Sequence, residues 1–461
     1  MQGLTEEVAS FIVNTTYSDI REEALRLAKR CMIDGTGVML SGVIDQSSSI
    51  VRAYLAELGG QPESTVLGSR LRLPAPAAAL ANGTSGHAQD FDDPQLSASP
   101  DRIYGLLTHP TTPVLASAFA IGEAAGIDGK ALLTAFSLGF EVECKIAEAI
   151  NPLHYKKGYH STGTIGAFGA TAAAGKILGL SERQMRCALG IAASESSGIR
   201  ANFGTMTKPF HAGRAAENGI FAAQLAKRGF TADPDILESP WGYFRIFGDG
   251  FDPEKIAGQL GNPYSIVFPG VSIKPYPCGV LSHPSMNAML DLVAGYHFRP
   301  EDVEEVRLYA GSNILDPLRY ALPQTSLEAK FSLPFCLTSI LLRGKAGIRE
   351  FSDEFVRSAE VQAGMKRIKT FRDQAIEDQG YDRILSRIEV SLKNGTILTA
   401  QSGPYKGGPE NPLSDDELDQ KFRECASLTL SATRVEEALG RLRTVEACHD
   451  VKELISLLTS D

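Results

Sequence analysis

Apolar residues recur with two different periods along this chain of 461 residues, and the change falls near Pro263. Up to about Tyr264 they recur every three to four positions, which is the period of one face of an α-helix. After that point, runs at residues 306–310 and 388–392 alternate apolar and polar side chains, which is typical of strands with one buried face. We therefore expect a helical part followed by an α+β part.

The expected helices of the first part are rich in Ala and Gly, which lets helix axes approach closely. Ser18 is expected to cap the first of them. Gly163, Gly166 and Gly169 lie three apart, so we expect them to line one ridge of a helix. After the helix that Ser18 caps, helices are expected at residues 48–58, 113–125, 129–149, 163–178, 182–194 and 209–228.

The α+β part contains a strong hairpin signal. Asn394-Gly395 follows the alternating run at 388–392 and precedes another apolar run, which predicts a type I′ turn with positive φ at both residues. Helical patterns alternate with the strands, at residues 283–296, 327–343 and 352–369.

The end of the chain is helical again. Ser414 and Glu417 have the spacing of a capping box, and the last helix carries an apolar stripe that indicates a return to the helical part. The predicted fold is mostly α: a large helical domain built from both chain ends (residues 1–267 and 401–461) and a smaller inserted α+β domain (residues 268–400).

Charge and composition exclude several classes of protein. Lys and Arg number 45 against 55 Asp and Glu, so the net charge of -10 argues against a nucleic-acid partner. The chain has no apolar run of about 18 residues and no signal-peptide pattern, so we expect a cytoplasmic protein without a membrane partner. Its seven Cys are scattered without a Cys-x-x-Cys pair, which indicates thiols in a reducing compartment.

Acidic residues crowd together in the stretch from His87 to Asp93. Asp90, Asp92 and Asp93 place three carboxylates within four residues. Carboxylates this close either bind a cation or raise the pKa of at least one of them. The cluster lacks the full ligand set of a magnesium site, so no metal is expected.

Four further stretches put His or Lys at expected helix starts. His109 precedes Pro110, where a helix start would lower its pKa and keep it neutral. Lys208 precedes a Pro that opens a helix, and a cation beside free backbone amides suits a carboxylate or phosphate. The other candidate residues in these stretches are His160, Thr164, His211, Arg214, Lys274, Tyr276 and His283.

These side chains favour one kind of chemistry. The sequence has no nucleophile elbow, no HExxH, no P-loop and no dinucleotide fingerprint. His, Lys and Asp at helix starts suit removal of a proton next to a carboxylate, because cations stabilise the developing charge while His or Lys moves the proton.

Together the stretches resemble the MmgE/PrpD family, whose members include 2-methylcitrate dehydratase, cis-aconitate decarboxylase and iminodisuccinate epimerase. The resemblance rests on NGTSGHAQDFDD, THP, GYHSTGTIGAFGATAAAGKILGLS, KPFHAGRAAENGIFAAQLAKRGF and IKPYPCGVLSHP. It implies a homodimer with its active site between the two domains. It also implies catalytic roles for Asp90, His109, His160, Lys208 and Lys274, and the same stretches supply the residues expected to bind substrate: His87, Thr164, His211, Arg214, Tyr276 and His283.

Departures from the family pattern help to choose among activities. Pro94 replaces a Thr common in dehydratases and decarboxylases, Thr111 replaces a Ser, and Gly279 stands where decarboxylases have a His. The chain also carries a longer insert, PQLSASPDRIYGLLT, expected to form a lid or rim. Cofactor-independent epimerisation of iminodisuccinate is therefore the leading hypothesis, with His109 and Lys208 or Lys274 carrying protons while His160 and Asp90 polarise or orient.

The alternatives remain open. A 2-methylcitrate dehydratase-type lyase would share the first proton abstraction, decarboxylation has the least support, and a non-catalytic polycarboxylate-binding protein is the alternative outside enzymes. In every case the expected ligand is a small polycarboxylate.

Overall fold

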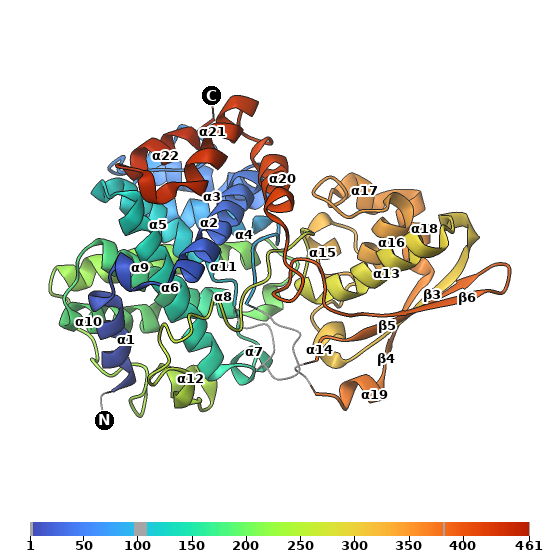
Figure 1. Ribbon diagram of the computed structural model, residues 1–461, viewed down its shortest axis with the longest axis horizontal. Coiled ribbons are helices and arrows are strands. Elements are labelled where there is room, and N and C mark those ends of the chain that lie inside the picture. Colours follow the sequence, from blue (N-terminus) through green and yellow to red (C-terminus); the bar gives the residue numbers. More distant parts are fainter. Residues whose placement is uncertain (1–2, 96–107, 381–382, 461) are drawn as a thin grey trace.

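The two sequence patterns correspond to two lobes (Figure 1). The computed structural model describes residues 3–95, 108–380 and 383–460. Helices from the first half of the chain form the larger lobe. They are α1 (Leu4–Asn14), α2 (Glu22–Gly42), α3 (Gln46–Leu58), α4 (Ala75–Ala88), α5 (Thr111–Ala125), α6 (Gly129–Ile150), α7 (Leu153–Lys156), α8 (Ser161–Thr164), α9 (Gly166–Ile177), α10 (Glu182–Glu195), α11 (Thr207–Lys227) and α12 (Tyr243–Gly248).

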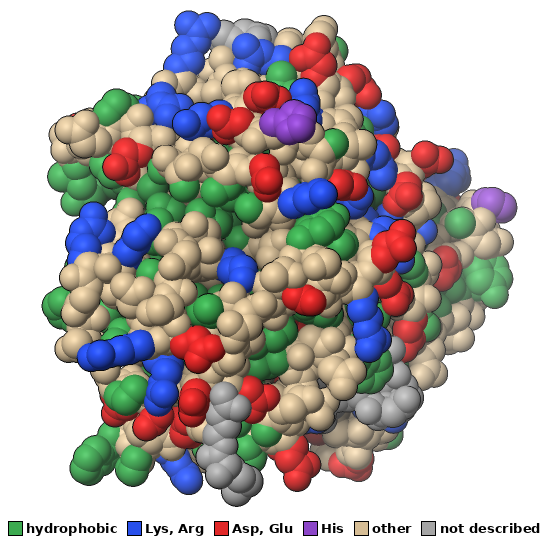
Figure 2. Space-filling view, turned by 60° about the vertical axis from the view of Figure 1, so that its left-hand side comes forward, with side chains coloured by type: hydrophobic (Ala, Val, Ile, Leu, Met, Phe, Trp, Pro, Cys, Tyr) green, Lys and Arg blue, Asp and Glu red, His purple; other side chains and the backbone are tan. Residues whose placement is uncertain are grey.

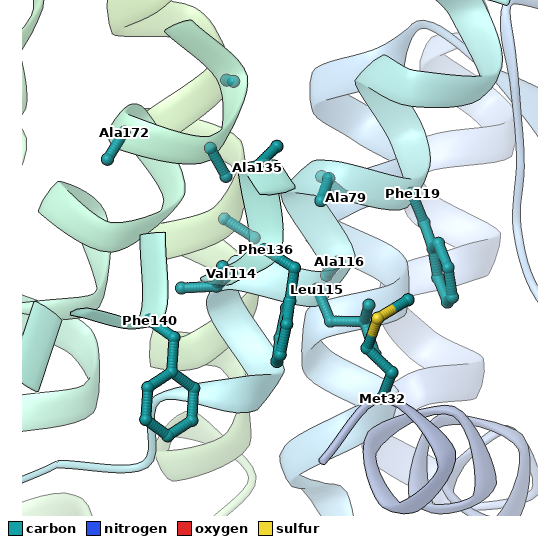
Figure 3. Packing of buried hydrophobic residues seen from close by; sticks show 14 of the residues in the cluster. Met32, Ala79, Val114, Leu115, Ala116, Phe119, Ala135, Phe136, Phe140 and Ala172 are labelled. Atoms are coloured by element: carbon teal, nitrogen blue, oxygen red, sulfur yellow. The ribbon is translucent and has the colours of Figure 1, made fainter. Parts of the chain in front are cut away.

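Small residues bring these helices close together. A Cβ added to Gly83 of α4 would lie 2.8 Å from Cα of Gly213 in α11, and one added to Gly139 of α6 would lie 2.6 Å from the carbonyl oxygen of Gly169 in α9. Larger side chains such as Leu115 and Phe136 fill the spaces between α5 and α6 (Figure 3). The abundance of Gly and Ala thus allows α4 and α11 to be buried in the centre of the lobe.

The smaller lobe has a mixed four-stranded sheet in the order β4-β3-β5-β6. β3 pairs in parallel with β4, whereas β5 is antiparallel to both β3 and β6. α13 packs against β5 and β6, and α16 packs against β4. The elements are β3 (Val303–Ala310), β4 (Ile368–Arg372), β5 (Ser386–Leu392), β6 (Ile397–Gln401), α13 (His283–Tyr296), α14 (Ser312–Leu315), α15 (Ser326–Ala329), α16 (Leu333–Arg343), α17 (Asp353–Arg357), α18 (Ala359–Lys366) and α19 (Gln374–Glu377). A separate two-stranded ribbon, β1 (Ser64–Thr65) with β2 (Arg72–Leu73), belongs to the helical lobe.

The last helices return to the first lobe, as the apolar stripe predicted. α20 (Asp415–Ala426) and α21 (Ala432–Arg443) pack on α2, and α22 (Val451–Leu457) packs on α5. The predicted capping box is present, with Ser414 accepting from the Glu417 amide. Phe422 of α20 lies against α2 at Gly37. The mostly helical fold with a smaller α+β lobe is therefore confirmed.

The division between the lobes is not sharp in the chain. Ile273 packs in the core of the helical lobe, and Tyr405 packs in the core of the α+β lobe. Tyr155 and Phe203 come from the first half of the chain but also pack in the α+β core. The boundaries at 267/268 and 400/401 stay a prediction, while these exchanges show that the lobes share an interface.

Several helix predictions need correction. Ser18 lies in a short 3-10 helix, Tyr17–Asp19, and α2 begins only at Glu22 after Arg21. The helix expected at 163–178 is interrupted at Ile165, between α8 and α9. Its glycines therefore do not line one ridge: Gly163 packs near His211, whereas Gly166 packs near Pro113.

The hairpin lies where it was predicted, but its turn differs. Leu392 bonds to Thr396 at the end of the ladder, so three residues form the loop. Within it, the Gly395 amide donates to the Leu392 carbonyl, and Gly395 has φ +87°. Asn394 does not have the positive φ of a type I′ turn. A three-residue loop can connect two paired strands when only its last residue is left-handed, so here only Gly395 needs a positive φ.

The helix expected at 352–369 is divided at Ser358 into α17 and α18, and the helix expected at 327–343 is divided into α15 and α16. α18 stops at Lys366, and the chain continues as the edge strand β4. The insert PQLSASPDRIYGLLT, expected as a lid or rim, falls mostly on residues 96–107, which lie outside the described residues.

Charges are intermixed on the face shown in Figure 2, where Lys and Arg side chains stand among Asp and Glu. Within the described ranges, none of the helices combines the length and apolar character that crossing a bilayer requires. All seven Cys are free thiols, as their spacing predicted.

Candidate functional site

The acidic cluster follows the end of α4 and lies at the interface between the lobes. α4 stops at Ala88, and Asp90 then adopts a left-handed conformation with φ +51°. His87, in the last turn of α4, holds Asp92 through its Nδ1, which lies 2.8 Å from Asp92 Oδ2. The local turn therefore points the carboxyl groups of Asp90 and Asp92 in different directions, so that they bind different partners.

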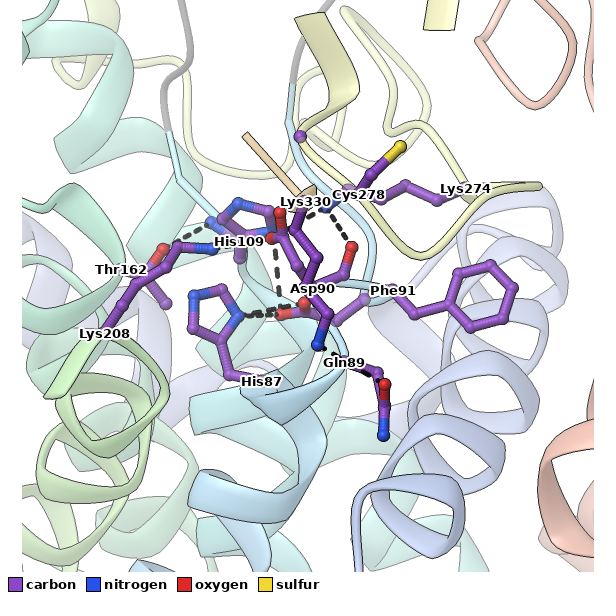
Figure 4. A network of polar contacts seen from close by, with 12 residues as sticks. His87, Gln89, Asp90, Phe91, His109, Thr162, Lys208, Lys274, Cys278 and Lys330 are labelled. Carbon is purple, nitrogen blue, oxygen red and sulfur yellow. Dashed lines mark hydrogen bonds and ion pairs between the residues drawn. The ribbon is translucent and has the colours of Figure 1, made fainter. Parts of the chain in front are cut away.

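Asp90 lies between two buried lysines (Figure 4). Nζ of Lys208 is 2.6 Å from Asp90 Oδ1, and Nζ of Lys274 is 3.1 Å from the same oxygen and 2.8 Å from the Asp90 carbonyl oxygen. All three residues are at most 4% exposed. Burial by itself raises the pKa of Asp90, but the two ammonium groups outweigh it and hold the pKa well below its usual value. The carboxylate is therefore ionised, and it joins elements from both sequence parts.

Histidines gather beside this ion triad. The ring of His87 lies 4.8 Å from that of His109 and 5.4 Å from that of His160, and Nδ1 of His160 is 3.0 Å from Nδ1 of His211. Burial lowers the pKa of all four imidazoles, in His211 to about 4. They are therefore neutral near pH 7. The sequence predicted a neutral His109 at a helix start, and its main cause is burial.

Asp92 and Asp93 differ in charge although they are adjacent. For Asp92, burial is outweighed by His87 and His109, so its pKa is lowered. For Asp93, burial and then the nearby Asp34 raise the pKa to about 8, and Thr111 donates to its Oδ2 at 2.7 Å. The sequence predicted that crowding would raise at least one carboxyl pKa. The pKa of Asp93 is raised, but burial and Asp34, which lies outside the cluster, contribute more than the adjacent Asp92.

A small cavity opens beside Asp90 between the lobes. Its polar wall is formed by Asp90, His109, Lys208 and Lys274. The space that it leaves for water is about 20 Å³, room for about one molecule. A polycarboxylate therefore enters only if the walls separate. The remaining lining is mostly apolar and comes from both lobes: Tyr155, Phe203, Gly279, Val280, Leu281, Pro317, Leu318 and Phe331.

One set of side chains has the spacing of metal ligands. A nitrogen of His87, a nitrogen of His109 and an oxygen of Asp90 lie within 4.8 Å of one another. His87 Nε2, His109 Nδ1 and Asp90 Oδ2 also find no hydrogen-bond partner among the described residues. However, Lys208 and Lys274 sit on the other oxygen of Asp90, where two positive charges oppose a cation. The arrangement is better suited to an anion or a water molecule.

The structure brings most predicted site residues together. Asp90, His109, Lys208 and Lys274 line the cavity, and His87, His160 and His211 stand behind them. Four others lie elsewhere, and their substrate-binding roles stay predictions. Thr164 bonds to His154 Nε2, Arg214 pairs with Glu217, and Tyr276 packs on His283, which contacts Cys278.

Several residues of the site carry no signal in the sequence. Phe203 and Phe331 stack with ring centroids 5.4 Å apart, and Lys208 Nζ lies 5.4 and 5.1 Å from those centroids. Lys330 is buried beside the end of α4. None of these stands in a motif, so only the three-dimensional contacts identify them.

Comparison with known proteins gives matches along nearly the whole chain. The family model for the MmgE/PrpD N-terminal domain matches residues 6–256, and that for the MmgE/PrpD C-terminal domain matches residues 276–444. Cis-aconitate decarboxylase from Mus musculus is 28% identical over 476 residues, covering 99% of this chain and 94% of that protein. Cis-aconitate decarboxylase from Homo sapiens is 28% identical over 473 residues (99% and 95%), and that from Aspergillus terreus is 26% identical over 486 residues (99% and 96%).

Proposed function

This chain belongs to the MmgE/PrpD family, and from that premise we propose that it removes a proton next to a carboxylate of a small polycarboxylic acid. The observation that carries the proposal is the pair of buried ammonium groups of Lys208 and Lys274, which converge on Asp90 in a cavity that His109 also lines. The relatives compared above are enzymes, and their decarboxylase activity is that of a lyase.

The charges of the cavity suit the chemistry. When a base removes the proton, the electron pair of the C–H bond moves into the adjacent carboxylate, which gains negative charge. Ammonium groups held in a site closed to water stabilise that charge without having to reorganise. Lys208 and Lys274 supply such groups, because both are at most 4% exposed.

The protonation states support a division of roles. Burial keeps His109 neutral, so its ring can accept a proton. Burial also lowers the pKa of Lys208, so its ammonium group releases a proton more readily than an exposed lysine does. Asp90 fixes both lysines, and His160 stands behind the cavity through its contacts with His87 and Phe203.

Return of the proton to the opposite face of the carbon gives epimerisation, and iminodisuccinate is the substrate we propose. The cavity wall at Gly279 supports this outcome over decarboxylation: a Cβ there would lie 2.9 Å from Leu318 Cδ2 and 3.3 Å from the Lys330 carbonyl oxygen, so the position offers little room for an imidazole. Decarboxylation of cis-aconitate is the second candidate, favoured by the activity of the relatives.

Proton NMR in deuterium oxide separates the outcomes. The protein is incubated with iminodisuccinate, cis-aconitate and 2-methylcitrate. Deuterium at the α-carbon with loss of optical rotation supports epimerisation. Two vinyl signals in place of the single vinyl signal of cis-aconitate support decarboxylation, and replacement of the methyl doublet of 2-methylcitrate by an allylic methyl singlet supports dehydration. Saturation transfer from the protein to an acid, without deuterium exchange or turnover, would show that the protein binds the acid but does not catalyse a reaction.

A matched pair of variants tests whether the reaction depends on the cavity. Lys274→Met removes an ammonium group from the cavity, whereas Lys345→Met removes one from an exposed position, where the lysine side chain is 66% exposed. Only the first is expected to abolish exchange. Equal exchange by both variants would reject the proposed role of the lysine pair. The homodimer and the cytoplasmic location stay predictions, and light scattering of the purified protein tests the first.

A further inference from the structure

Three lysines bind the main chain that carries Asp90. Lys330 Nζ donates to the Ala88 carbonyl at 2.7 Å, Lys274 Nζ to the Asp90 carbonyl at 2.8 Å, and Lys421 Nζ to the Phe91 carbonyl at 2.9 Å. Lys421 belongs to α20, whereas Lys330 lies between α15 and α16 in the α+β lobe. The segment from Ala88 to Phe91 is thus held by cations from distant parts of the chain.

This segment needs such partners. The last carbonyls of a helix have no partner within it, so the Ala88 carbonyl at the end of α4 requires one from outside. Asp90 follows in a left-handed conformation, which residues with a Cβ rarely adopt, although Asp adopts it more readily than most. A cation near the carboxyl end of a helix is favourable, so Lys330 stabilises the conformation that aims Asp90 at the cavity.

Lys330 is buried without a carboxylate of its own. It is 3% exposed, and within the described ranges no Asp or Glu oxygen forms an ion pair with its Nζ. Besides the Ala88 carbonyl, its Nζ meets the side-chain oxygen of Gln89 at 3.4 Å. Burial lowers the pKa of Lys330, and Asp45 and Asp90 offset this only in part, from beyond ion-pair distance. Lys421, by contrast, pairs with Asp34.

Lys330 also connects this segment to the cavity wall. Its own carbonyl accepts from the Gly279 amide at 2.8 Å, and Gly279 lines the cavity. Its side chain and main chain therefore contact the segment that carries Asp90 and the opposite wall, which belong to different lobes. Lys330 is not among the described residues that line the cavity itself.

We propose that Lys330 is a positioning residue, which holds the carboxyl end of α4 and thereby places Asp90 and His87 when the two lobes are in contact. Its effect on turnover rests on the proposed function, but its effect on the Ala88–Phe91 segment does not. The test therefore begins without any substrate.

Hydrogen exchange of the full chain, followed by mass spectrometry, measures the segment directly. In Lys330→Met, peptides covering residues 86–93 are expected to exchange at least about tenfold faster than in the wild type, because a charge-assisted bond to the helix end is lost. In the exposed control Lys345→Met they exchange at the wild-type rate. Unchanged exchange in Lys330→Met, or equal acceleration throughout both lobes, would overturn the proposal.

Turnover gives the second measurement. With whichever acid proves to be the substrate, Lys330→Met is expected to lower kcat about tenfold or more and to change KM less than about threefold, because Lys330 positions Asp90 without touching the ligand. If Lys330→Met does not fold, Lys330→Gln keeps a donor on an aliphatic stem and is expected to show the same local acceleration to a smaller degree. Wild-type exchange at residues 86–93 in Lys330→Gln would also overturn the proposal.

Discussion

Asp93→Asn tests the electrostatics of the acidic cluster. Asp93 is fully buried, its Oδ1 finds no hydrogen-bond partner among the described residues, and its pKa is raised to about 8 by burial and by Asp34. In an unfolded chain the same carboxyl has a pKa of about 3.9. The folded protein therefore binds one more proton than the unfolded protein at any pH between these values.

The size of the effect follows from this difference. Because the folded pKa lies above the unfolded one, the contribution of Asp93 to stability is complete below about pH 4 and is lost as the pH rises to about 8. One extra bound proton makes the free energy of unfolding fall by about 1.4 kcal/mol per pH unit in that range. Asn does not titrate, so the variant lacks this loss. Between pH 5 and 7 it is expected to gain about 3 kcal/mol relative to the wild type.

Urea unfolding followed by circular dichroism at pH 5, 6 and 7 measures this difference, since the other titrating groups are common to both proteins. Asp291→Asn, at an exposed position on α13, is the control and is expected to give a constant difference from the wild type. A constant difference for Asp93→Asn as well would refute the raised pKa, and with it the account of Asp93 as a neutral neighbour of the site.

Three further changes give expected results. Lys274→Met is expected to lower turnover of the substrate at least about 100-fold in the deuterium assay, and full turnover would reject its role. Gly83→Ala places a Cβ 2.8 Å from Gly213 Cα and is expected to destabilise the protein by roughly 1–3 kcal/mol, whereas Gly295→Ala, with open space around it, is expected to be neutral or slightly stabilising in the same urea titration. Ser414→Ala removes the cap of α20 and is expected to cost about 1 kcal/mol, seen as a lower unfolding midpoint.

Local pattern predicted the helices whose residues favour that conformation. α13 begins and ends at the residues that the apolar period indicated, His283 and Tyr296. α5 is buried on nearly all sides and was also predicted. α4 was not predicted, because the residues 82–86 in its second half, NGTSG, are weak helix formers. β4 was missed because only Ile368 in it is buried, so the edge strand has no alternating pattern.

The residues of the site differ in how clearly the local sequence marks them. Asp90, His109, Lys208 and Lys274 stand in stretches where Pro, Gly or clustered charge distinguishes them in the sequence. Lys330 stands in an ordinary stretch, and the carbonyl that it binds is 242 residues away in the chain. A contact of this kind leaves no local signal, so only the folded chain reveals it.

The return of the last helices to α2 has a consequence for the order in which the protein matures on the ribosome. The sheet of the α+β lobe is complete once β6 has emerged, but the helical lobe still lacks α20, α21 and α22, from Asp415 to Leu457. At typical rates of synthesis that segment takes about 2 to 9 seconds to make. Throughout this interval the apolar surface of α2 that Phe422 later covers is exposed to chaperones and proteases. The first lobe to be synthesised is therefore the last to be finished.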